Sequence, residues 1–162
     1  MSKDQKKQLG VLSLIVALVV VLLGSLLFVG AVSGWFDNNK VVLSPEFYSE
    51  NAEMVNITAD DYERMIKERK SFIVFVDQGG CDTAVRLRGY IEDYTKEAGM
   101  RVNRLYFQDM KETSLHEYVK YYPSVVMVSE GRVVGYLKAD SDEDADKYND
   151  YDAFKKWMEL FL

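Results

Sequence analysis

The chain has 162 residues but only one cysteine, one histidine and two prolines. A single cysteine, Cys81, excludes a disulfide within the chain and leaves a thiol that is free or that pairs with another molecule. The only histidine, His116, has no cysteine near it in the sequence and falls on the polar side of an expected helix. We therefore expect neither a metal site nor a bound cofactor.

Charged residues are absent from residues 9–36, where leucine, valine, isoleucine and alanine dominate. About 20 apolar residues span a bilayer, so this run predicts one transmembrane helix. A cleavable signal peptide has a much shorter apolar core, although the small residues at 31–33 leave cleavage open. Gly30 and Gly34 form a G-x-x-x-G pattern, which is a weak indication of helix pairing and leaves the oligomeric state open.

The flanks of the apolar run predict its orientation. Three lysines and one aspartate precede it, and an excess of lysine favours the cytoplasmic side. We expect residues 1–8 to form a cytoplasmic tail and residues 9–36 a single-pass anchor in the cell membrane. The rest of the chain should then lie outside.

Basic residues are outnumbered in the part after the tail, which carries 25 acidic and 17 basic side chains. Nucleic-acid binding needs a basic face, so this surface excludes a nucleic-acid partner. A basic or neutral partner is favoured, although an acidic surface also serves solubility alone.

The remaining sequence divides into a tether and a domain. Residues 37–51 are polar without a clear period, which predicts a tether. Residues 52–162 alternate strand-like and helix-like patterns in the order β-α-β-α-β-α-β-β-α. The last two strands are separated by Glu130 and Gly131 and should form an antiparallel hairpin. This order predicts an α/β domain with a mixed sheet covered by helices on both faces.

Apolar residues at spacings of three and four predict the helices of the domain. Thr58 and Asp61 form an approximate capping box at the start of the first, and Gly99 is a stop signal for the second. The expected helices cover residues 58–70, 84–98, 113–122 and 151–162.

An acidic stretch, residues 140–152, carries alternating aspartates like a calcium loop. However, Ala145 replaces the required glycine, and Tyr151 replaces the bidentate glutamate. We expect a solvated acidic loop, with weak calcium binding by clustered carboxylates as the alternative.

Cys81 lies where a buried strand gives way to a helix. A thiol at a helix N-terminus faces unpaired N–H groups and the positive end of the helix dipole, which favour the thiolate. Arg86 and Arg88 would add to this effect if they turned back, whereas Asp77 and Asp82 oppose it. The alternative is that Cys81 is a small apolar residue that packs at the start of a helix.

Two segments resemble the thioredoxin superfamily: "SFIVFVDQGGCDTA" looks like its active-site strand and loop, and "YYPSVVMVSEGRVVGYL" like its cis-proline loop and hairpin. The resemblance covers about residues 54–162 and implies the thioredoxin fold, preceded here by one N-terminal transmembrane helix. It also implies that Cys81 is the catalytic nucleophile. Bacterial membrane-tethered members share such an N-terminal span. The residues that it implies for substrate binding are Gly80, Tyr122, Pro123 and Ser124.

The sequence also departs from that family. Ala84 stands where the resolving cysteine belongs, Gly80 replaces the usual tryptophan, and Phe75 replaces a buried aspartate. Without a resolving thiol, release of a mixed disulfide needs an external thiol. Ala84 is either a natural change or an engineered replacement, and both interpretations stay open.

Two functions remain in view. The first is a membrane-anchored protein outside the cytoplasm that engages the thiols or disulfides of exported proteins through Cys81, which would make it a monothiol oxidoreductase. The second is a non-catalytic interaction module of a transport or envelope complex. Whether the chain is an enzyme is left open.

Overall fold

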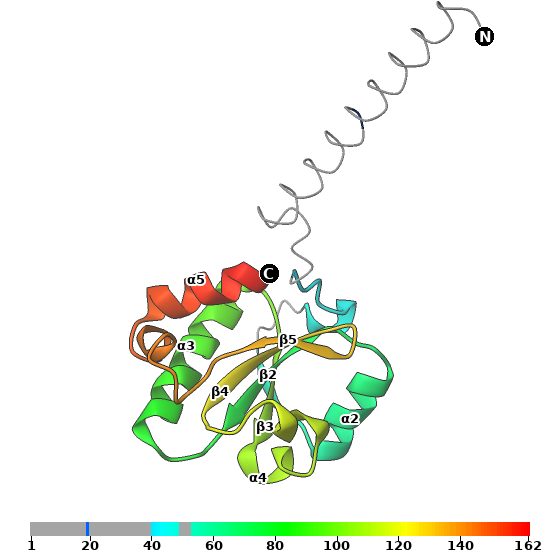
Figure 1. The fold of residues 1–162 in the computed structure, drawn as a ribbon, viewed down its shortest axis with the longest axis horizontal. Helices are drawn as coiled ribbons and strands as arrows, with labels where there is room; N and C mark the ends of the chain where they lie inside the picture. The colour runs from blue at the N-terminus through cyan, green and yellow to red at the C-terminus, as the bar shows by residue number, and fades with distance from the viewer. Residues whose placement is uncertain (1–18, 20–39, 49–52) are drawn as a thin grey trace, which may run out of the picture. The chain divides into compact units, whose positions relative to one another are not determined.

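The computed structural model describes residue 19, residues 40–48 and residues 53–162 of the chain (Figure 1). The expected tail and anchor, together with Gly30 and Gly34, lie outside the described residues except for Val19. Among the residues that are described, no helix is both long and apolar enough to cross a membrane. The elements below all belong to residues 40–162.

Five strands form one mixed sheet in the order β1-β3-β2-β4-β5. The first three of these neighbours run parallel, and β4 and β5 are antiparallel to their partners, as the sequence predicts. The strands are β1 (Met54–Asn56), β2 (Phe72–Asp77), β3 (Val102–Tyr106), β4 (Ser124–Ser129) and β5 (Arg132–Tyr136).

Helices and short helical turns connect these strands. The α-helices within residues 40–162 are α2 (Ala59–Lys67), α3 (Asp82–Ala98), α4 (Phe107–Met110) and α5 (Tyr151–Phe161). The 3-10 helices are η1 (Pro45–Phe47), η2 (Ser114–Glu117) and η3 (Ala145–Tyr148).

The central strand, β2, is buried along its whole length. Successive side chains of a strand point to opposite faces of the sheet. The first and last residues of β2, five positions apart, therefore lie on opposite faces. Phe72 contacts the Tyr62 ring of α2, with centroids 5.9 Å apart, whereas Asp77 pairs with Arg88 of α3. Helices α2 and α3 therefore cover opposite faces, and α5 lies beside α3 (Figure 1).

Local signals place several of the boundaries where the sequence predicts them. Thr58 and Asp61 form the expected capping box at the start of α2, each accepting a hydrogen bond from the other's backbone N–H at 3.1 Å. Helix α3 ends at Gly99, whose φ of +62° is the left-handed conformation typical of a helix stop.

The β4–β5 hairpin turns at the predicted pair, Glu130 and Gly131, whose φ angles are +48° and +73°. Two successive positive φ values are typical of the tight turn that matches the twist of antiparallel strands. A Cβ atom on Gly131 would lie 2.5 Å from the Ile66 carbonyl oxygen, so glycine is also required by the close approach of α2.

The third expected helix, 113–122, is not a full helix. Only η2 forms there, with Leu115 and Val119 buried. Tyr118, three residues after Leu115, would lie on the apolar stripe of a full helix, but its side chain is 46% exposed. Leu115 and Val119 bury only one helical turn of this segment. The tyrosines between and after them do not extend the apolar face, so no longer helix forms.

The structure also corrects the expected tether at 37–51. Within it, Val41, Leu43 and Phe47 are at most 3% exposed and belong to the hydrophobic core. Val41 and Leu43 alternate with exposed or half-buried neighbours, as in a strand. This alternation covers only a few residues before Pro45, so it is too short to be recognised from the sequence. The packed domain therefore includes residues 41–48 and does not begin at residue 52.

Two backbone hydrogen bonds and one contact between aromatic rings fix this segment to three distant parts of the domain. The Val41 N–H donates to the Phe161 carbonyl at 2.6 Å, at the end of α5. The Phe47 carbonyl accepts from the Arg101 N–H at 2.8 Å, and the Phe47 ring lies 5.9 Å from that of Phe72. The segment thus closes one end of the core.

We predict that Phe47→Ala lowers the free energy of unfolding by about 3–5 kcal/mol, because it removes a large buried side chain and leaves a cavity. Urea unfolding of the purified protein measures this loss. Tyr48→Ala is the control, since the Tyr48 side chain is 51% exposed and its removal should cost far less. Equal losses in the two variants would contradict the packing of this segment.

Candidate functional site

Cys81 caps the N-terminus of α3. Its backbone is extended, and its Sγ accepts a hydrogen bond from the Ala84 N–H at 3.4 Å, in the manner of a capping serine or aspartate. The thiol also donates to Gln78 Oε1 at 3.8 Å. In the first contact the sulfur is a hydrogen-bond acceptor, and in the second the S–H group is a donor. Cys81 is partly exposed and can therefore be reached by another molecule.

Ala84 lies one turn further along α3 and is fully buried. It provides the N–H that contacts Cys81 Sγ, while its methyl group packs into the interior. The side chain at this position is thus close to Cys81 and shielded from solvent. Because the chain has only one cysteine, no second sulfur is available on this turn.

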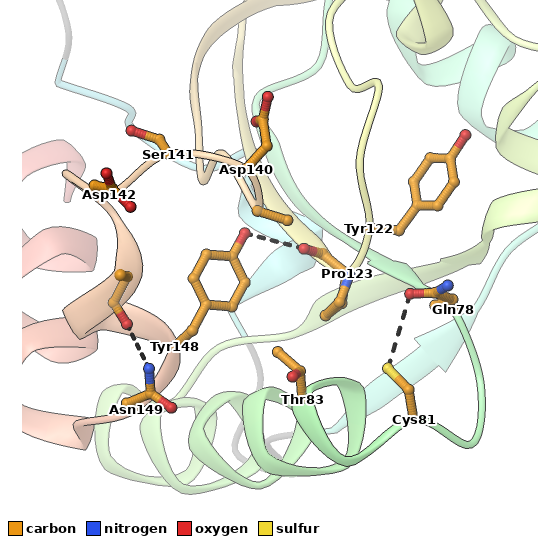
Figure 2. A pocket seen from close by; sticks show the side chains of 12 residues that line it. Gln78, Cys81, Thr83, Tyr122, Pro123, Asp140, Ser141, Asp142, Tyr148 and Asn149 are labelled. Carbon is orange, nitrogen blue, oxygen red and sulfur yellow. Dashed lines mark hydrogen bonds between the residues drawn. The ribbon is translucent and has the colours of Figure 1, made fainter.

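The Tyr122–Pro123 peptide bond is cis, as the family resemblance implies, and Pro123 is buried. Figure 2 shows the Tyr122 ring turned away from Cys81. That ring packs against Phe107, with centroids 5.4 Å apart. The Tyr122 backbone makes no hydrogen bond to the part of the chain that the structure describes. Within that part of the chain, its N–H and C=O are therefore unpaired.

Cys81 and the proline loop line the same pocket, which has a volume of about 400 Å³. Its walls come from three segments that are far apart in the sequence (Figure 2). The loop before α3 and the start of that helix supply Gln78, Cys81 and Thr83. The proline loop supplies Tyr122 and Pro123, and residues 139–149 form the third wall.

The third wall comes from the acidic stretch, which is therefore more than a solvated loop. Tyr148 is only 6% exposed, and its hydroxyl donates to the Pro123 carbonyl at 3.0 Å. Burial raises the pKa of Tyr148 well above its ordinary value, so the hydroxyl stays protonated as a donor. Sequence reasoning missed this role, because an isolated tyrosine in a polar loop carries no periodic signal.

The carboxylates of this stretch form ordinary protein contacts. Asp144 accepts from the Lys138 N–H at 2.8 Å and pairs with Lys147 at 3.3 Å, and Asp146 also pairs with Lys147. Among the described residues, no group of three or more histidine, cysteine, aspartate or glutamate side chains is placed to hold a metal ion.

The two remaining residues expected to bind substrate are placed differently. Gly80 is exposed beside Cys81 in the chain but does not line the pocket. Ser124 is fully buried, and its hydroxyl donates to the Leu137 carbonyl at 2.7 Å. The Ser124 side chain is thus closed to a ligand.

The two arginines that were considered as partners of Cys81 are engaged elsewhere. Arg86 donates to the Asn149 side chain and to the Tyr148 carbonyl, which joins α3 to the third wall. Arg88 donates to Asp77 Oδ2 at 2.8 Å. Arg86 therefore connects α3 to the third wall of the pocket, and Arg88 connects α3 to the end of β2.

The sequence analysis considered Asp77 only as a negative charge that opposes a Cys81 thiolate, and the structure gives it a different role. It is fully buried, and its Oδ2 accepts from Arg88 and from Arg104 Nε at 2.8 and 2.6 Å. Its Oδ1 accepts from the Gly79 N–H at 2.8 Å. The expected repulsion between Asp77 and a thiolate is therefore offset by two guanidinium groups. A charge ending an apolar strand was the available signal, since buried charges need partners.

Neither a family model nor a curated protein matches the sequence. Solved thioredoxin structures do match the fold. A mutant thioredoxin from Halobacterium salinarum is 14% identical with a TM-score of 0.53, and the match covers 70% of this chain and 93% of that one. Thioredoxin f from spinach chloroplast is 13% identical with a TM-score of 0.53, covering 74% and 95%. Thioredoxin from Schistosoma mansoni is 12% identical with a TM-score of 0.51, covering 68% and 99%.

These similarities show that the chain has the thioredoxin fold, with a mixed five-stranded sheet flanked by helices. At such low identity they extend to the fold alone.

We predict that Tyr148→Phe lowers the free energy of unfolding by about 1 kcal/mol near neutral pH, because the hydrogen bond to Pro123 is lost. Since an unfolded tyrosine ionises near pH ~10 while folded Tyr148 keeps its proton, its contribution is complete below that pH and lost as pH rises further. The variant should therefore lose less stability than the wild type above pH ~10. Tyr121→Phe, at a side chain that is 58% exposed, is the control for urea unfolding across this range.

Proposed function

We propose that this protein carries out thiol–disulfide exchange with exported proteins through Cys81, while anchored in the cell membrane with its domain outside. One observation carries the proposal. Cys81 Sγ accepts a hydrogen bond from the Ala84 N–H of α3, in a pocket that it shares with the cis Tyr122–Pro123 loop. An accessible sulfur at a helix N-terminus can react as the thiolate.

The chemical step is an exchange of sulfur partners. The Cys81 thiolate attacks one sulfur of a substrate disulfide, a new S–S bond forms, and the other substrate sulfur leaves as a thiolate that takes up a proton. With alanine at position 84, the mixed disulfide cannot be released from within. An external thiol must attack it, and the electrons that return Cys81 to the thiolate come from that thiol.

The proline loop would hold the substrate backbone. Because the backbone groups of Tyr122 find no partner in the described part of the chain, an extended peptide can pair with them as an added strand. The ring of Tyr122 is packed away against Phe107 and leaves this approach open. Pairing of this kind needs no second cysteine.

The location of the protein is inferred from the sequence. The uncharged run at 9–36 and the lysines before it support a single-pass anchor with a cytoplasmic N-terminus. The acidic domain would then meet polypeptides after their export.

The second candidate is a non-catalytic interaction module in a transport or envelope complex. Ala84 favours this function, because a fully buried alanine stands where a dithiol site would need its second sulfur. The pocket and the free Tyr122 backbone would then serve binding alone.

We predict that Ala84→Cys gives the protein dithiol activity in an insulin-reduction assay, whereas the wild type accumulates long-lived mixed disulfides. The Ala84 N–H already contacts Cys81 Sγ, so a sulfur on this turn would lie within reach. The change enlarges a buried side chain and should cost about 1–3 kcal/mol of stability, which thermal unfolding checks.

The matched control is Ala84→Cys combined with Cys81→Ser, which keeps a thiol but removes the proposed nucleophile. Activity that persists in this double variant would contradict the role of Cys81. A folded Ala84→Cys variant without activity, or a wild-type thiol inert to iodoacetamide, would favour the binding module.

We predict that protease added to intact cells removes the domain, because the lysine-rich tail should remain in the cytoplasm. Immunoblotting against the C-terminal part of the chain measures this. A cytoplasmic protein in the same cells is the control for intactness, and full protection of the domain would contradict the proposed orientation.

A further inference from the structure

We infer that Asp77 is a positioning residue for Cys81, and that Arg88 and Arg104 set the charge behind the loop that carries this cysteine. The inference rests on the proposed exchange at Cys81. The proposed mechanism does not use these three side chains, and they do not line the pocket.

The geometry of the loop comes first. Asp77 is the last residue of β2, and its Oδ1 accepts from the backbone N–H two residues ahead, at Gly79. An aspartate that bonds its own chain two residues on closes a tight turn. Gly79 has a φ of +94°, which only glycine adopts easily. The turn therefore fixes the direction in which the chain approaches Cys81.

The arginines then fix the turn to the rest of the domain. Arg88 lies two turns into α3, and helical side chains lean toward the N-terminus, so it reaches back to the strand end. Arg104 lies on β3, next to β2 in the sheet, and its guanidinium also covers the Tyr106 ring at 4.6 Å. One carboxylate thus joins β2, the Cys81 loop, α3 and β3.

The charges in this cluster do not cancel. Two guanidinium groups pair with one carboxylate, so the three side chains together carry one positive charge. Side-chain exposures of 27% for Arg88, 19% for Arg104 and 0% for Asp77 mean that water screens this excess less than at the surface. A positive charge near a thiol favours the thiolate.

Negative groups face Cys81 from the other sides. Asp82 follows it in α3, and Asp140 and Asp142 lie on the third wall of the pocket. These carboxylates stay unchanged in the variants below. Differences between variants therefore report on the buried cluster.

The test is the pH dependence of Cys81 alkylation by iodoacetamide in the full-length protein in detergent. Asp77→Asn keeps an oxygen for Gly79 but removes a negative charge, so the alkylation midpoint should fall by about 0.3–0.6 pH units. Arg88→Gln removes a positive charge, so the midpoint should rise by about the same amount. Arg88→Lys keeps the charge and should restore the wild-type midpoint.

The opposite signs separate electrostatics from structure, because Asp77→Asn and Arg88→Gln break the same ion pair. Shifts in the same direction, or no shift in either folded variant, would overturn the inference. If Asp77→Asn does not fold, the difference between Arg88→Gln and Arg88→Lys decides the question. Lys155→Gln breaks an ion pair with Glu97 elsewhere on α3 and is the control, with no shift expected.

The positioning role has its own measurement. Asp77→Ala removes the acceptor for the Gly79 N–H, whereas Asp77→Asn retains one. Each variant is measured at the pH of its own alkylation midpoint, so that the same fraction of Cys81 is ionised in both. Asp77→Ala should then form mixed disulfides with a model disulfide peptide about tenfold more slowly than Asp77→Asn. Equal rates would overturn the positioning role. A wild type that is alkylated but forms no mixed disulfide would refute the proposed function, while the alkylation midpoints would still decide the electrostatic part of the inference.

Discussion

A carboxylate without access to water is stable only when it is paired and hydrogen-bonded, and Asp77 meets this requirement with donors from three parts of the chain. Strand β2 runs through the centre of the core, so a carboxylate at its end is buried. It is stable only if neighbouring elements provide hydrogen-bond donors of opposite charge. Arg88 on α3 and Arg104 on β3 are those donors. The same requirement draws the start of α3 toward the sheet, and the candidate site lies there.

The cap on α3 explains why the fold does not depend on a second cysteine at the site. A helix N-terminus needs an acceptor for its free N–H groups, and Cys81 Sγ provides one for Ala84. This contact stabilises the helix whether or not a second sulfur is present, and Ala84 fills its place with a buried methyl group. A single-cysteine site can therefore be well folded, while in the proposed exchange the release of a mixed disulfide would depend on a thiol from outside.

Much of the fold follows from short-range patterns in the sequence. The order of elements, the hairpin at Glu130 and Gly131, the Thr58 cap and the place of Cys81 all depend on residues within a few positions of one another. What could not be predicted depends on distant partners. The apolar residues Val41, Leu43 and Phe47 form too short a pattern to be assigned to the core until the side chains against which they pack are known. The pairing of Asp77 with Arg104 joins positions 27 residues apart.

The pocket shows the same limit more sharply, because its three walls meet only in the folded chain. The Tyr148 hydroxyl holds the Pro123 carbonyl across 25 residues of sequence, and Arg86 ties α3 to Asn149 beside it. The acidic stretch therefore supports the cis-proline loop from one side while the Phe107–Tyr122 contact supports it from the other. With both sides fixed, the loop would have little left to reorganise if the unpaired backbone of Tyr122 bound a partner, and preorganisation of this kind would favour recognition with or without a redox step.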